Sequence, residues 1–356
     1  MTQPFPLDIY AGPTAFQRLQ ERGWDSSLFD LLLGASGGPK WLVLCQLDMA
    51  LNQTLLEKRS SPLTALGSSI GCWRHAYLAQ PDAEAAMQAF LDPYIHQTYD
   101  KKPTTAEISQ VTRDMLSDLL GQQGKQAILA ERKLRTRIVT ARAPSLVNPK
   151  NPIRVGRHML GAAIGNTLSR ARLQKHFQRV VFHSGATPTE ALPLRDFDTQ
   201  WIPLIDDTIA PAIHASSSIP AVLVGESNIH GAPEGHYWDG GIIDYHFDLR
   251  DYDGDGLVLY PHFTHQITPG WFDKMRKTRK LDPRAIDKLV LICPSQRYIS
   301  RLPHAKIPDR SDFRRFDQTM RQRYWQAVVE RGEILAEAWL KVMNDSNPVR
   351  FVERSL

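Results

Sequence analysis

Short apolar runs that end in glycine-rich loops recur in the first eighty residues of the chain. Residues 29–33 (FDLLL) stop at the loop of residues 34–40 (GASGGPK), and residues 41–55 then show the apolar spacing of a helix. A second run, residues 62–66, leads into residues 67–71 (GSSIG) and another helical pattern. Repetition of a buried strand, a loop and a helix is typical of parallel α/β sheets.

The rest of the chain carries further strand and helix patterns. Additional strands are predicted at residues 180–182, 201–204, 256–260 and 289–292, and amphipathic helices at residues 82–99 and 105–120. Residues 313–343 form one or two helices, in which Trp325 and Trp339 recur with aliphatic neighbours at helical spacing. We therefore predict that both tryptophans pack in the core.

No repeat, low-complexity tract or linker divides the chain, so we predict a single domain over residues 1–356. A basic helical insertion over the sheet is predicted for residues 82–178, because two helical patterns precede a basic stretch broken by Pro144, Pro149 and Pro152. Residues 313–343 are predicted as a C-terminal helical segment.

Positive charge is concentrated in the middle of the chain. The formal net charge is +5, but residues 125–179 hold thirteen Lys or Arg and one acid, Glu131. Such an excess attracts polyanions and favours peripheral contact with an anionic membrane, unless acids elsewhere in the fold offset it. Nucleic acid is not an expected partner, because Phe177 is the one aromatic residue in the stretch and no reading module is recognisable.

The N-terminal residues lack the basic start and apolar run of a signal peptide, and no window has eighteen apolar residues. We expect a cytoplasmic protein with peripheral membrane contact. Cys45, Cys72 and Cys293 are widely spaced, which argues against a disulfide framework or a zinc site, and no cofactor motif is present.

Residues 67–71 fit the pattern G-x-S-x-G of a nucleophile elbow, with Ser69 at its centre. In such an elbow the serine occupies a tight turn between strand and helix, and Gly67 and Gly71 avoid clashes with the neighbouring backbone. The hydroxyl of Ser69 would lie at a helix N-terminus, where free amides favour negative charge that develops nearby.

Acyl transfer at a serine also needs donors aimed at the oxyanion. Residues 36–40 (SGGPK) can supply them, because the backbone N–H groups of Gly37 and Gly38 approach a substrate without side-chain obstruction. A phosphate loop is disfavoured, since Lys40 is followed by Trp41 where that motif requires Ser or Thr. A tight turn that binds no ligand would have the same composition.

The proton acceptor for Ser69 is left open by the residue types alone. An α/β hydrolase would place an acid and then a histidine after the serine, and His262, His265 and His304 are the candidates. None of the three lies in a diagnostic motif.

Four elements in a fixed order resemble the patatin-like phospholipase family. They are the glycine-rich loop at residues 36–40, the elbow at residues 67–71, residues 215–220 (ASSSIP) and residues 239–241 (DGG). The resemblance implies a three-layer α/β sandwich with a mainly parallel central sheet and a nucleophile elbow.

The resemblance also implies that Ser69 attacks the acyl carbonyl, that Asp239 takes its proton directly, and that no histidine takes part. The oxyanion hole would use Gly37 and Gly38 within the loop from Ser36 to Lys40. Since aspartate is a weak base, Asp239 must be partly desolvated, and its neighbours Trp238, Ile242 and Ile243 are compatible with that.

Three positions depart from the family pattern. The chain has Ser36 where a third glycine is usual, Trp41 where a small residue closes the loop, and Asp244-Tyr245 where asparagine and proline follow the DGG motif. Trp41 and Ile70 are candidate substrate-binding residues, and Trp41 could narrow the acyl site.

Residues 251–256 (DYDGDG) match the first half of a calcium loop, with Asp251, Asp253 and Asp255 as candidate ligands. The twelfth position is His262 instead of the bidentate glutamate, so an acidic surface turn is favoured and no metal site is predicted.

The function that these patterns favour is hydrolysis of an acyl ester of a phospholipid, lysophospholipid or related lipid through an acyl-enzyme. An acyl thioesterase shares the same intermediate. A non-catalytic protein that binds membrane surfaces on the same fold is a second hypothesis, and an α/β hydrolase with a histidine base is a third.

Overall fold

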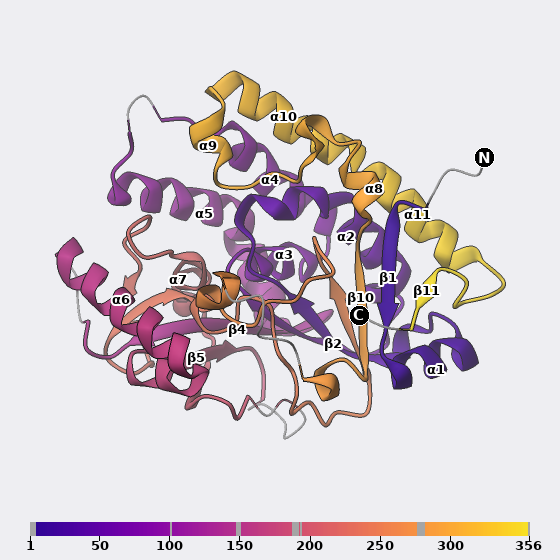
Figure 1. Cartoon of the computed structure of the whole chain (residues 1–356), viewed down its shortest axis with the longest axis horizontal. Helices are drawn as coiled ribbons and strands as arrows, with labels where there is room; N and C mark the ends of the chain where they lie inside the picture. The colour runs from indigo at the N-terminus through magenta and orange to yellow at the C-terminus, as the bar shows by residue number, and fades with distance from the viewer. Residues whose placement is uncertain are drawn as a thin grey trace.

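The computed structural model describes residues 5–354, except residues 100–101, 147–150, 187–191, 193 and 276–281. These residues form an α/β structure around a mixed, mainly parallel central sheet (Figure 1). Its strands are β1 (Leu7–Ala11), β2 (Phe29–Gly34), β3 (Leu63–Ser68), β4 (Leu134–Ala143), β5 (Gln178–His183), β6 (Thr199–Pro203), β7 (Glu226–Ser227), β8 (His236–Asp239), β9 (Leu257–Pro261), β10 (Leu289–Pro294) and β11 (Val352–Glu353).

Eleven α-helices accompany the strands in the described part of the chain. They are α1 (Pro13–Arg22), α2 (Cys45–Leu51), α3 (Ile70–Leu78), α4 (Ala83–His96), α5 (Thr105–Ala130), α6 (Pro152–Leu168), α7 (Asp206–Ser217), α8 (Gln296–Ile299), α9 (Asp312–Arg315), α10 (Gln318–Arg331) and α11 (Glu333–Asn344). Shorter helical turns are η1 (Ser26–Leu28), η2 (Gly38–Val43), η3 (Asn52–Leu56), η4 (Arg170–Lys175), η5 (Gly240–Ile242), η6 (Trp271–Met275), η7 (Pro283–Ala285) and η8 (Pro303–Ala305).

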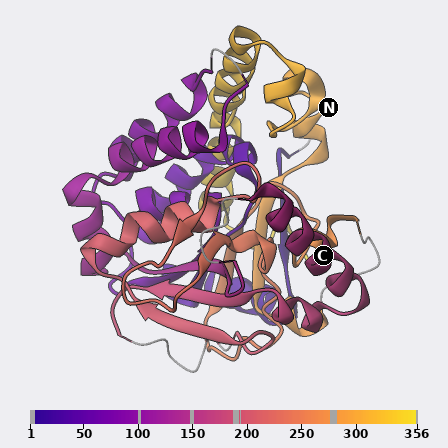
Figure 2. The same ribbon diagram turned by 90° about the vertical axis from the view of Figure 1, so that its left-hand side faces the viewer.

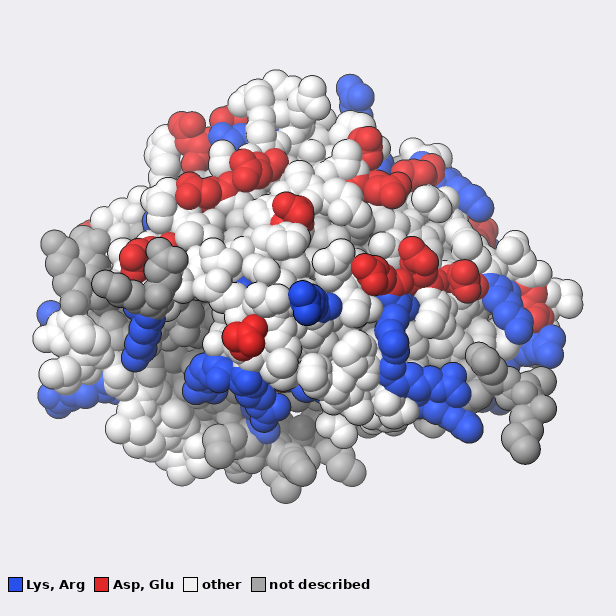
Figure 3. All heavy atoms as spheres, turned by 90° about the horizontal axis from the view of Figure 1, so that it is seen from above, with Lys and Arg blue, Asp and Glu red and all other residues white. Residues whose placement is uncertain are grey.

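The strand order along the sheet is β11-β1-β10-β9-β2-β3-β4-β5-β6, and β8 joins through β4. The consecutive strands from β10 to β4 are all parallel, whereas β1 and β5 run antiparallel to their inner neighbours. Figure 2 shows most of the helices stacked above this sheet, with α6 lying to one side. Seen from above, acids are spread over the middle of the surface, and Lys and Arg gather along its lower margin (Figure 3).

Most of the strand and helix patterns read from the sequence are confirmed. The predicted strands correspond to β2, β3, β5, β6, β9 and β10, and the pattern at residues 41–55 corresponds to α2 with the flanking η2 and η3. Trp325 and Trp339 are both fully buried in the core, as predicted. No helix in the described residues is both long and apolar enough to cross a bilayer.

The prediction of a helical insertion over residues 82–178 is wrong at β4, which is an inner strand of the sheet. Its arginines suggested a surface segment, but the fold accommodates them individually. Arg135 is exposed, whereas the buried Arg137 donates to the carbonyl oxygens of Thr136 (3.0 Å) and Ser184 (2.6 Å). Carbonyl acceptors satisfy the guanidinium inside the sheet, so charge does not exclude this strand from the interior.

Strand β4 positions two other strands end to end. On one edge, β4 pairs with β3 as far as Val139 and with β8 from Thr140 to Ala143. On its other edge, residues 137–142 of β4 pair with β5. A strand has two edges, and β5 fills one of them, so β8 continues along the edge that β3 leaves. Because β3 runs parallel to β4 and β8 runs antiparallel, the carboxyl ends of β3 and β8 meet.

This meeting of strands requires glycine beside it. A Cβ atom on Gly71 would lie 2.0 Å from the carbonyl oxygen of Gly34, and one on Gly240 would lie 2.1 Å from that of Val139. Both contacts are with backbone atoms, which cannot rotate away.

We predict that Gly71→Ala lowers the free energy of unfolding by about 3 kcal/mol or more, because α3 must move away from β2. Urea denaturation measures the change. The matched control is Gly156→Ala on α6, where nothing lies within 4 Å of the new methyl group. That substitution should stabilise the protein by about 0.5–1 kcal/mol through the helix propensity of alanine. Equal effects of the two substitutions would contradict the close approach of α3 to β2.

Candidate active site

Ser69 occupies the turn between β3 and α3. Its backbone is in an unusual conformation, with φ 54° and ψ −130°, and the residue is 3% exposed. A non-glycine residue with positive φ is strained, and such strain is concentrated at functional sites. The side chain leaves this turn at the N-terminus of α3, where the first amides of the helix have no partner within it.

Asp239 meets Ser69 from the end of β8. The hydroxyl Oγ of Ser69 donates a hydrogen bond to Oδ2 of Asp239 at 2.9 Å, and the backbone N–H of Gly241 donates to Oδ1 at 2.7 Å. The carboxylate is thus held from both sides. These contacts explain both glycines of the DGG motif. Gly240 packs against the backbone of Val139, and the N–H of Gly241 orients the carboxylate of Asp239.

The environment makes Asp239 a stronger base than an ordinary aspartate. Burial raises its pKa above 3.8, although Arg310, the Gly241 amide, the Ser69 hydroxyl and Lys274 each act in the opposite direction. Desolvation penalises the charged carboxylate, so the group accepts a proton more readily.

The serine-rich segment at residues 215–220 ties the two strand ends together. The backbone N–H of Ser69 donates to Oγ of Ser216 at 2.9 Å, and that hydroxyl donates to the carbonyl of Val139 at 2.6 Å. The carbonyl of Ser218 accepts a hydrogen bond from the backbone N–H of Asp239 at 2.8 Å. One short segment therefore fixes the backbone positions of both Ser69 and Asp239.

The glycine-rich loop passes from the end of β2 into η2 beside the elbow. Gly38 has φ 55°, and within the described residues no hydrogen bond uses the backbone N–H of Gly37 or Gly38. The N–H of Ser36 is occupied by the carbonyl of Tyr245 at 3.0 Å. Of the loop residues, Gly37 and Gly38 therefore have amides free to donate to an oxyanion.

The two side chains at the ends of this loop have packing partners. Oγ of Ser36 lies 2.7 Å from Oγ of Ser68. The ammonium of Lys40 lies 4.7 Å from the centre of the Phe263 ring, and burial lowers the pKa of Lys40. The same ring lies 2.5 Å from the position a Cβ on Gly37 would take, so a side chain there would collide with it.

A cavity of about 770 Å³ opens at Ser69. Its walls come from η2, α3, α4, α5, the segment after α7, and the region around α9 and α10. Most of the lining is apolar, including Ile70, Trp73, Phe90, Met115 and Phe313. A volume and lining of this kind suit a ligand with a large apolar part.

The two candidate substrate-binding residues lie at different depths. Ile70 lines the cavity next to Ser69. Trp41 is 1% exposed and packs behind the lining, stacking on Phe90 at 4.7 Å and meeting Tyr94 edge-on at 5.5 Å. Trp41 thus supports two wall residues from behind.

A second, small hollow is bordered by Asp239. Ser36, Tyr245, Trp271, Lys274 and Arg310 are among its lining residues, and Arg310 also lines the large cavity. The ammonium of Lys274 lies 3.7 Å from the centre of the Tyr245 ring. The two hollows therefore adjoin at Ile219 and Arg310, which line both. The large cavity is mostly apolar, whereas the small hollow is bordered by Arg310 and by Lys274, whose pKa burial lowers to about 7.

The three histidines considered as bases have other neighbours. Nδ1 of His262 accepts a hydrogen bond from the backbone N–H of Thr264, His265 contacts the Tyr10 ring, and His304 packs against Phe316 and Tyr324. None of the three bonds Ser69 in the part of the chain that the structure describes.

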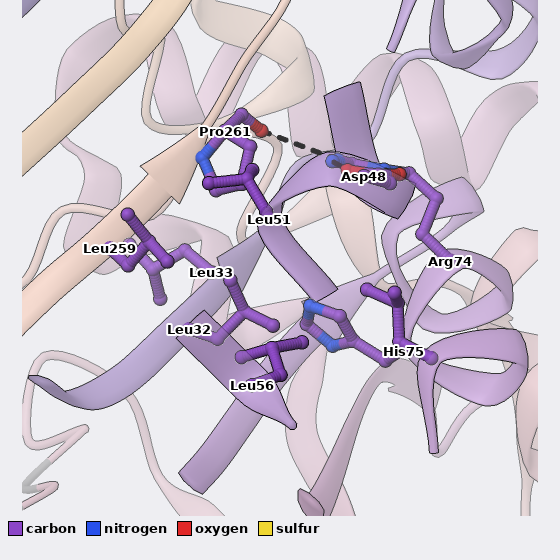
Figure 4. Close-up of a pocket in the computed structure, with 10 residues that line it drawn as sticks. Leu32, Leu33, Asp48, Leu51, Leu56, Arg74, His75, Leu259 and Pro261 are labelled. Carbon is purple, nitrogen blue, oxygen red and sulfur yellow. Dashed lines mark hydrogen bonds and ion pairs between the residues drawn. The ribbon is translucent and has the colours of Figure 1, made fainter. Parts of the chain in front are cut away.

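Another histidine lies directly beneath the elbow. Burial, with Arg74 nearby, lowers the pKa of His75 to about 3. Figure 4 shows His75 beside Leu33 and Leu56, and Asp48 and Arg74 above them, around a cavity of about 10 Å³. His75 is neutral at physiological pH and fills space under the turn.

The ion pair of Arg74 with Asp48 joins α3 to α2. The guanidinium donates to both carboxylate oxygens, at 2.6 and 2.8 Å, and also reaches the carbonyl of Pro261 at 3.3 Å (Figure 4). Both side chains are almost fully buried. A bidentate pair of this kind fixes orientation as well as distance, and it holds α3 in place behind Ser69.

Asp244, one of the positions at which the sequence departs from the patatin-like pattern, is paired with arginines of the basic stretch. Asp244 is buried and accepts from Arg179 at 2.7 and 2.8 Å and from Arg170 at 3.3 Å. Asp244 therefore anchors the turn after the DGG motif to β5 and η4.

The acidic turn at residues 251–256 has structural contacts. The backbone N–H of Gly256 donates to Asp30 at 2.8 Å, and Arg18 donates to the carbonyl of Asp255. The described residues contain no group of three or more His, Cys, Asp or Glu arranged to hold a metal ion.

Sequence reasoning missed Ser216, Ser218, Lys274 and Arg310. The segment at residues 215–220 signalled the first two, without revealing what they hold. Nothing local marks Lys274 or Arg310, because they reach Asp239 from far along the chain.

Comparison of the chain with protein-family models and with curated protein sequences returns no match.

We predict that Asp239→Asn has a higher free energy of unfolding than wild type at pH 7. The folded-state pKa of Asp239 lies above 3.8, the ordinary value that applies in the unfolded chain. Protonation of Asp239 therefore stabilises the folded state fully below pH 3.8, and this stabilisation is lost as the pH rises through the folded-state pKa. Asparagine is neutral at every pH and keeps the contribution. The gain should vanish near pH 3, as measured by urea denaturation across pH.

The matched control is Asp244→Asn, another buried aspartate five positions away. It leaves Arg179 without its full charge partner and should cost about 3–5 kcal/mol at pH 7. If Asp239→Asn were destabilising at pH 7 in the same way, Asp239 would be a structural ion-pair residue instead of a desolvated base.

Proposed function

We propose that this chain is a serine acyl hydrolase with a patatin-like, three-layer architecture, and that Ser69 and Asp239 are its catalytic pair. The observation that carries the proposal is the hydrogen bond of 2.9 Å from Ser69 Oγ to a buried Asp239, at a strained turn that opens into an apolar cavity. The absence of a histidine beside Ser69 in the described residues favours this pair over a triad.

In the proposed reaction, Ser69 Oγ attacks the acyl carbonyl carbon while its proton moves to Oδ2 of Asp239. The backbone N–H groups of Gly37 and Gly38 donate to the carbonyl oxygen as it becomes an oxyanion. Collapse of the tetrahedral intermediate expels the alcohol, which takes the proton from Asp239. Water then attacks the acyl-enzyme and loses a proton to Asp239. As the bond between the acyl carbon and Ser69 Oγ breaks, Asp239 gives that proton to Ser69 Oγ and the carboxylic acid leaves.

The preferred substrate class is a lipid acyl ester. The apolar lining of the large cavity suits an acyl chain, and the hollow beside Asp239 suits the leaving group. Arg310 and Lys274 border that hollow, and Arg310 has no ion pair among the described residues. A leaving group with a negative charge, such as the phosphodiester of a phospholipid or lysophospholipid, complements Arg310. It would also favour the protonated form of Lys274, whose pKa burial lowers to about 7.

A fluorophosphonate probe should label Ser69 covalently, as located by mass spectrometry of the digested protein. Ser69→Ala should lose the adduct, and Asp239→Asn should slow labelling and hydrolysis by roughly a hundredfold to ten-thousandfold. Ser217→Ala is the matched control, because Ser217 lines the same cavity and its hydroxyl bonds the carbonyl of Ile213. An adduct on another residue, or one indifferent to Asp239, would overturn the proposal.

Arg310→Gln should raise KM for anionic phospholipid or lysophospholipid about tenfold and leave KM for a neutral monoacylglycerol nearly unchanged. Because Arg310 also lowers the pKa of Asp239, the acid limb of kcat/KM should move to higher pH for both substrates. Arg314→Gln is the control, since Arg314 lines the large cavity without bordering the hollow at Asp239. Equal losses on charged and neutral esters would contradict the role in leaving-group recognition.

A further inference from the structure

Helix α6 carries four large aliphatic side chains that face solvent. Ile153, Leu160, Ile164 and Leu168 are 70%, 61%, 56% and 65% exposed. They include the most exposed large hydrophobic residues of the described chain. Single exposed apolar residues are ordinary, but four on one 17-residue helix form a patch that calls for a partner.

The four residues share one face of the helix. Their spacings of seven, four and four positions keep them within about 80° of each other around the axis, at 100° per residue. The opposite face, with Val155, Ala162 and Asn166, is buried. There Val155 and Ala162 join an apolar cluster with Ala141 and Ala143 of β4. Helix α6 therefore has a buried apolar face and an exposed apolar face.

Exposed cations lie within the apolar stripe and beside it. Arg154, Arg157, Arg172 and Lys175 are exposed, on α6 or the adjoining η4. The sequence has no acid between Glu131 and Glu190 to offset them. Basic residues beside an exposed aliphatic stripe are the features of a helix that lies in the interface of a membrane.

The basic stretch of residues 125–179 does not form one continuous surface. Arg179 is 1% exposed and paired with Asp244 and Asp196, Arg170 pairs with the same two acids, and Lys125 pairs with Asp206. The surface predicted from charge alone is therefore too broad. The exposed cations that accompany apolar side chains are those of α6 and η4.

The buried face of α6, opposite the stripe, packs near the hollow beside Asp239. Helix α6 packs against η6, which contributes Trp271 and Lys274 to that hollow. Nδ2 of Asn166 donates to Oδ1 of Asp273 at 2.7 Å across this contact. A surface held against the stripe would therefore lie one helix diameter, ~10 Å, from the η6 residues that border this hollow. Figure 2 shows α6 on the outside of the molecule, beyond the strands.

We propose that the α6 stripe, defined as Ile153, Leu160, Ile164 and Leu168 with their neighbouring cations, docks the protein on an anionic lipid bilayer. A second copy of the chain fits less well, because a two-fold contact would bring identical cations together. Nucleic acid would complement the cations but leave the aliphatic side chains exposed to water. A bilayer with acidic head groups complements both.

Co-sedimentation with vesicles tests the docking surface. The full chain should bind phosphatidylglycerol/phosphatidylcholine vesicles more strongly than pure phosphatidylcholine vesicles, and salt should weaken that binding. Leu160→Ser/Ile164→Ser and, separately, Arg154→Gln/Arg157→Gln should each reduce the partition coefficient on anionic vesicles about tenfold or more. Performing the assay in a Ser69→Ala background measures binding alone, so its result is independent of the proposed hydrolysis.

Matched controls change the same chemistry elsewhere. Ile334→Ser/Leu340→Ser removes two exposed aliphatic side chains from α11, and Arg297→Gln/Arg323→Gln removes two exposed arginines. Both controls should bind anionic vesicles as wild type does. All variants should unfold cooperatively in urea with a midpoint close to that of wild type, which verifies, independently of any hydrolysis, that each one folds.

Three results would overturn the proposal. The first is wild-type protein that does not bind anionic vesicles. The second is α6 variants that bind like the controls. The third is light scattering that finds a dimer which the α6 variants dissociate while vesicle binding stays unchanged, because the occupant would then be a second copy of the chain.

Discussion

The site depends on one constraint in the sheet, which is that β3 and β8 share a single edge of β4. Since β5 occupies the opposite edge of β4, β3 and β8 can only meet end to end. Ser69 follows β3 directly and Asp239 ends β8, so Ser69 Oγ lies 2.9 Å from Oδ2 of Asp239. Gly240 follows from this geometry, because a Cβ atom there would strike the backbone of Val139 in β4, whereas Gly71 lets α3 pack closely against Gly34 of β2. The hydrogen bonds of Ser216 and Ser218 hold the junction from a third segment.

As the proposed proton acceptor for Ser69, Asp239 must be partly desolvated, and its burial has a cost in stability. Burial raises the pKa of Asp239, which makes it a better proton acceptor and at the same time makes its charged form unfavourable in the folded protein. The nearby positive charges of Arg310 and Lys274 limit that cost without forming an ion pair with the carboxylate in the described structure. A direct salt bridge would have stabilised Asp239 as an anion and weakened it as a base.

The sequence predicted most of the local structure correctly, and it named the residues that meet in the site. Strand β10 is a continuous apolar run, β2 is one apart from Asp30, and the elbow and DGG motifs are short enough to recognise by eye. Strand β4 was missed because its arginines resemble a surface pattern, whereas in the sheet Arg137 is satisfied by carbonyl oxygens. Arg310 was missed for a different reason. Its role depends on tertiary proximity to Asp239, and no local pattern records which distant segment folds over a site.

The same distinction explains why charge alone misjudged the basic surface. Arg179 and Lys175 are four positions apart, yet Arg179 is sealed against Asp244 while Lys175 faces solvent. Net charge over a window sums the two equally, but a buried ion pair contributes almost nothing to the field outside the protein. The aliphatic stripe on α6 indicates which face of the protein the remaining cations belong to, and net charge alone could not do so. Only one face of that helix combines the exposed Arg157 with Leu160 and Ile164. A candidate membrane-docking face can be inferred when side-chain burial, charge and exposed apolar residues all point to the same face of the protein.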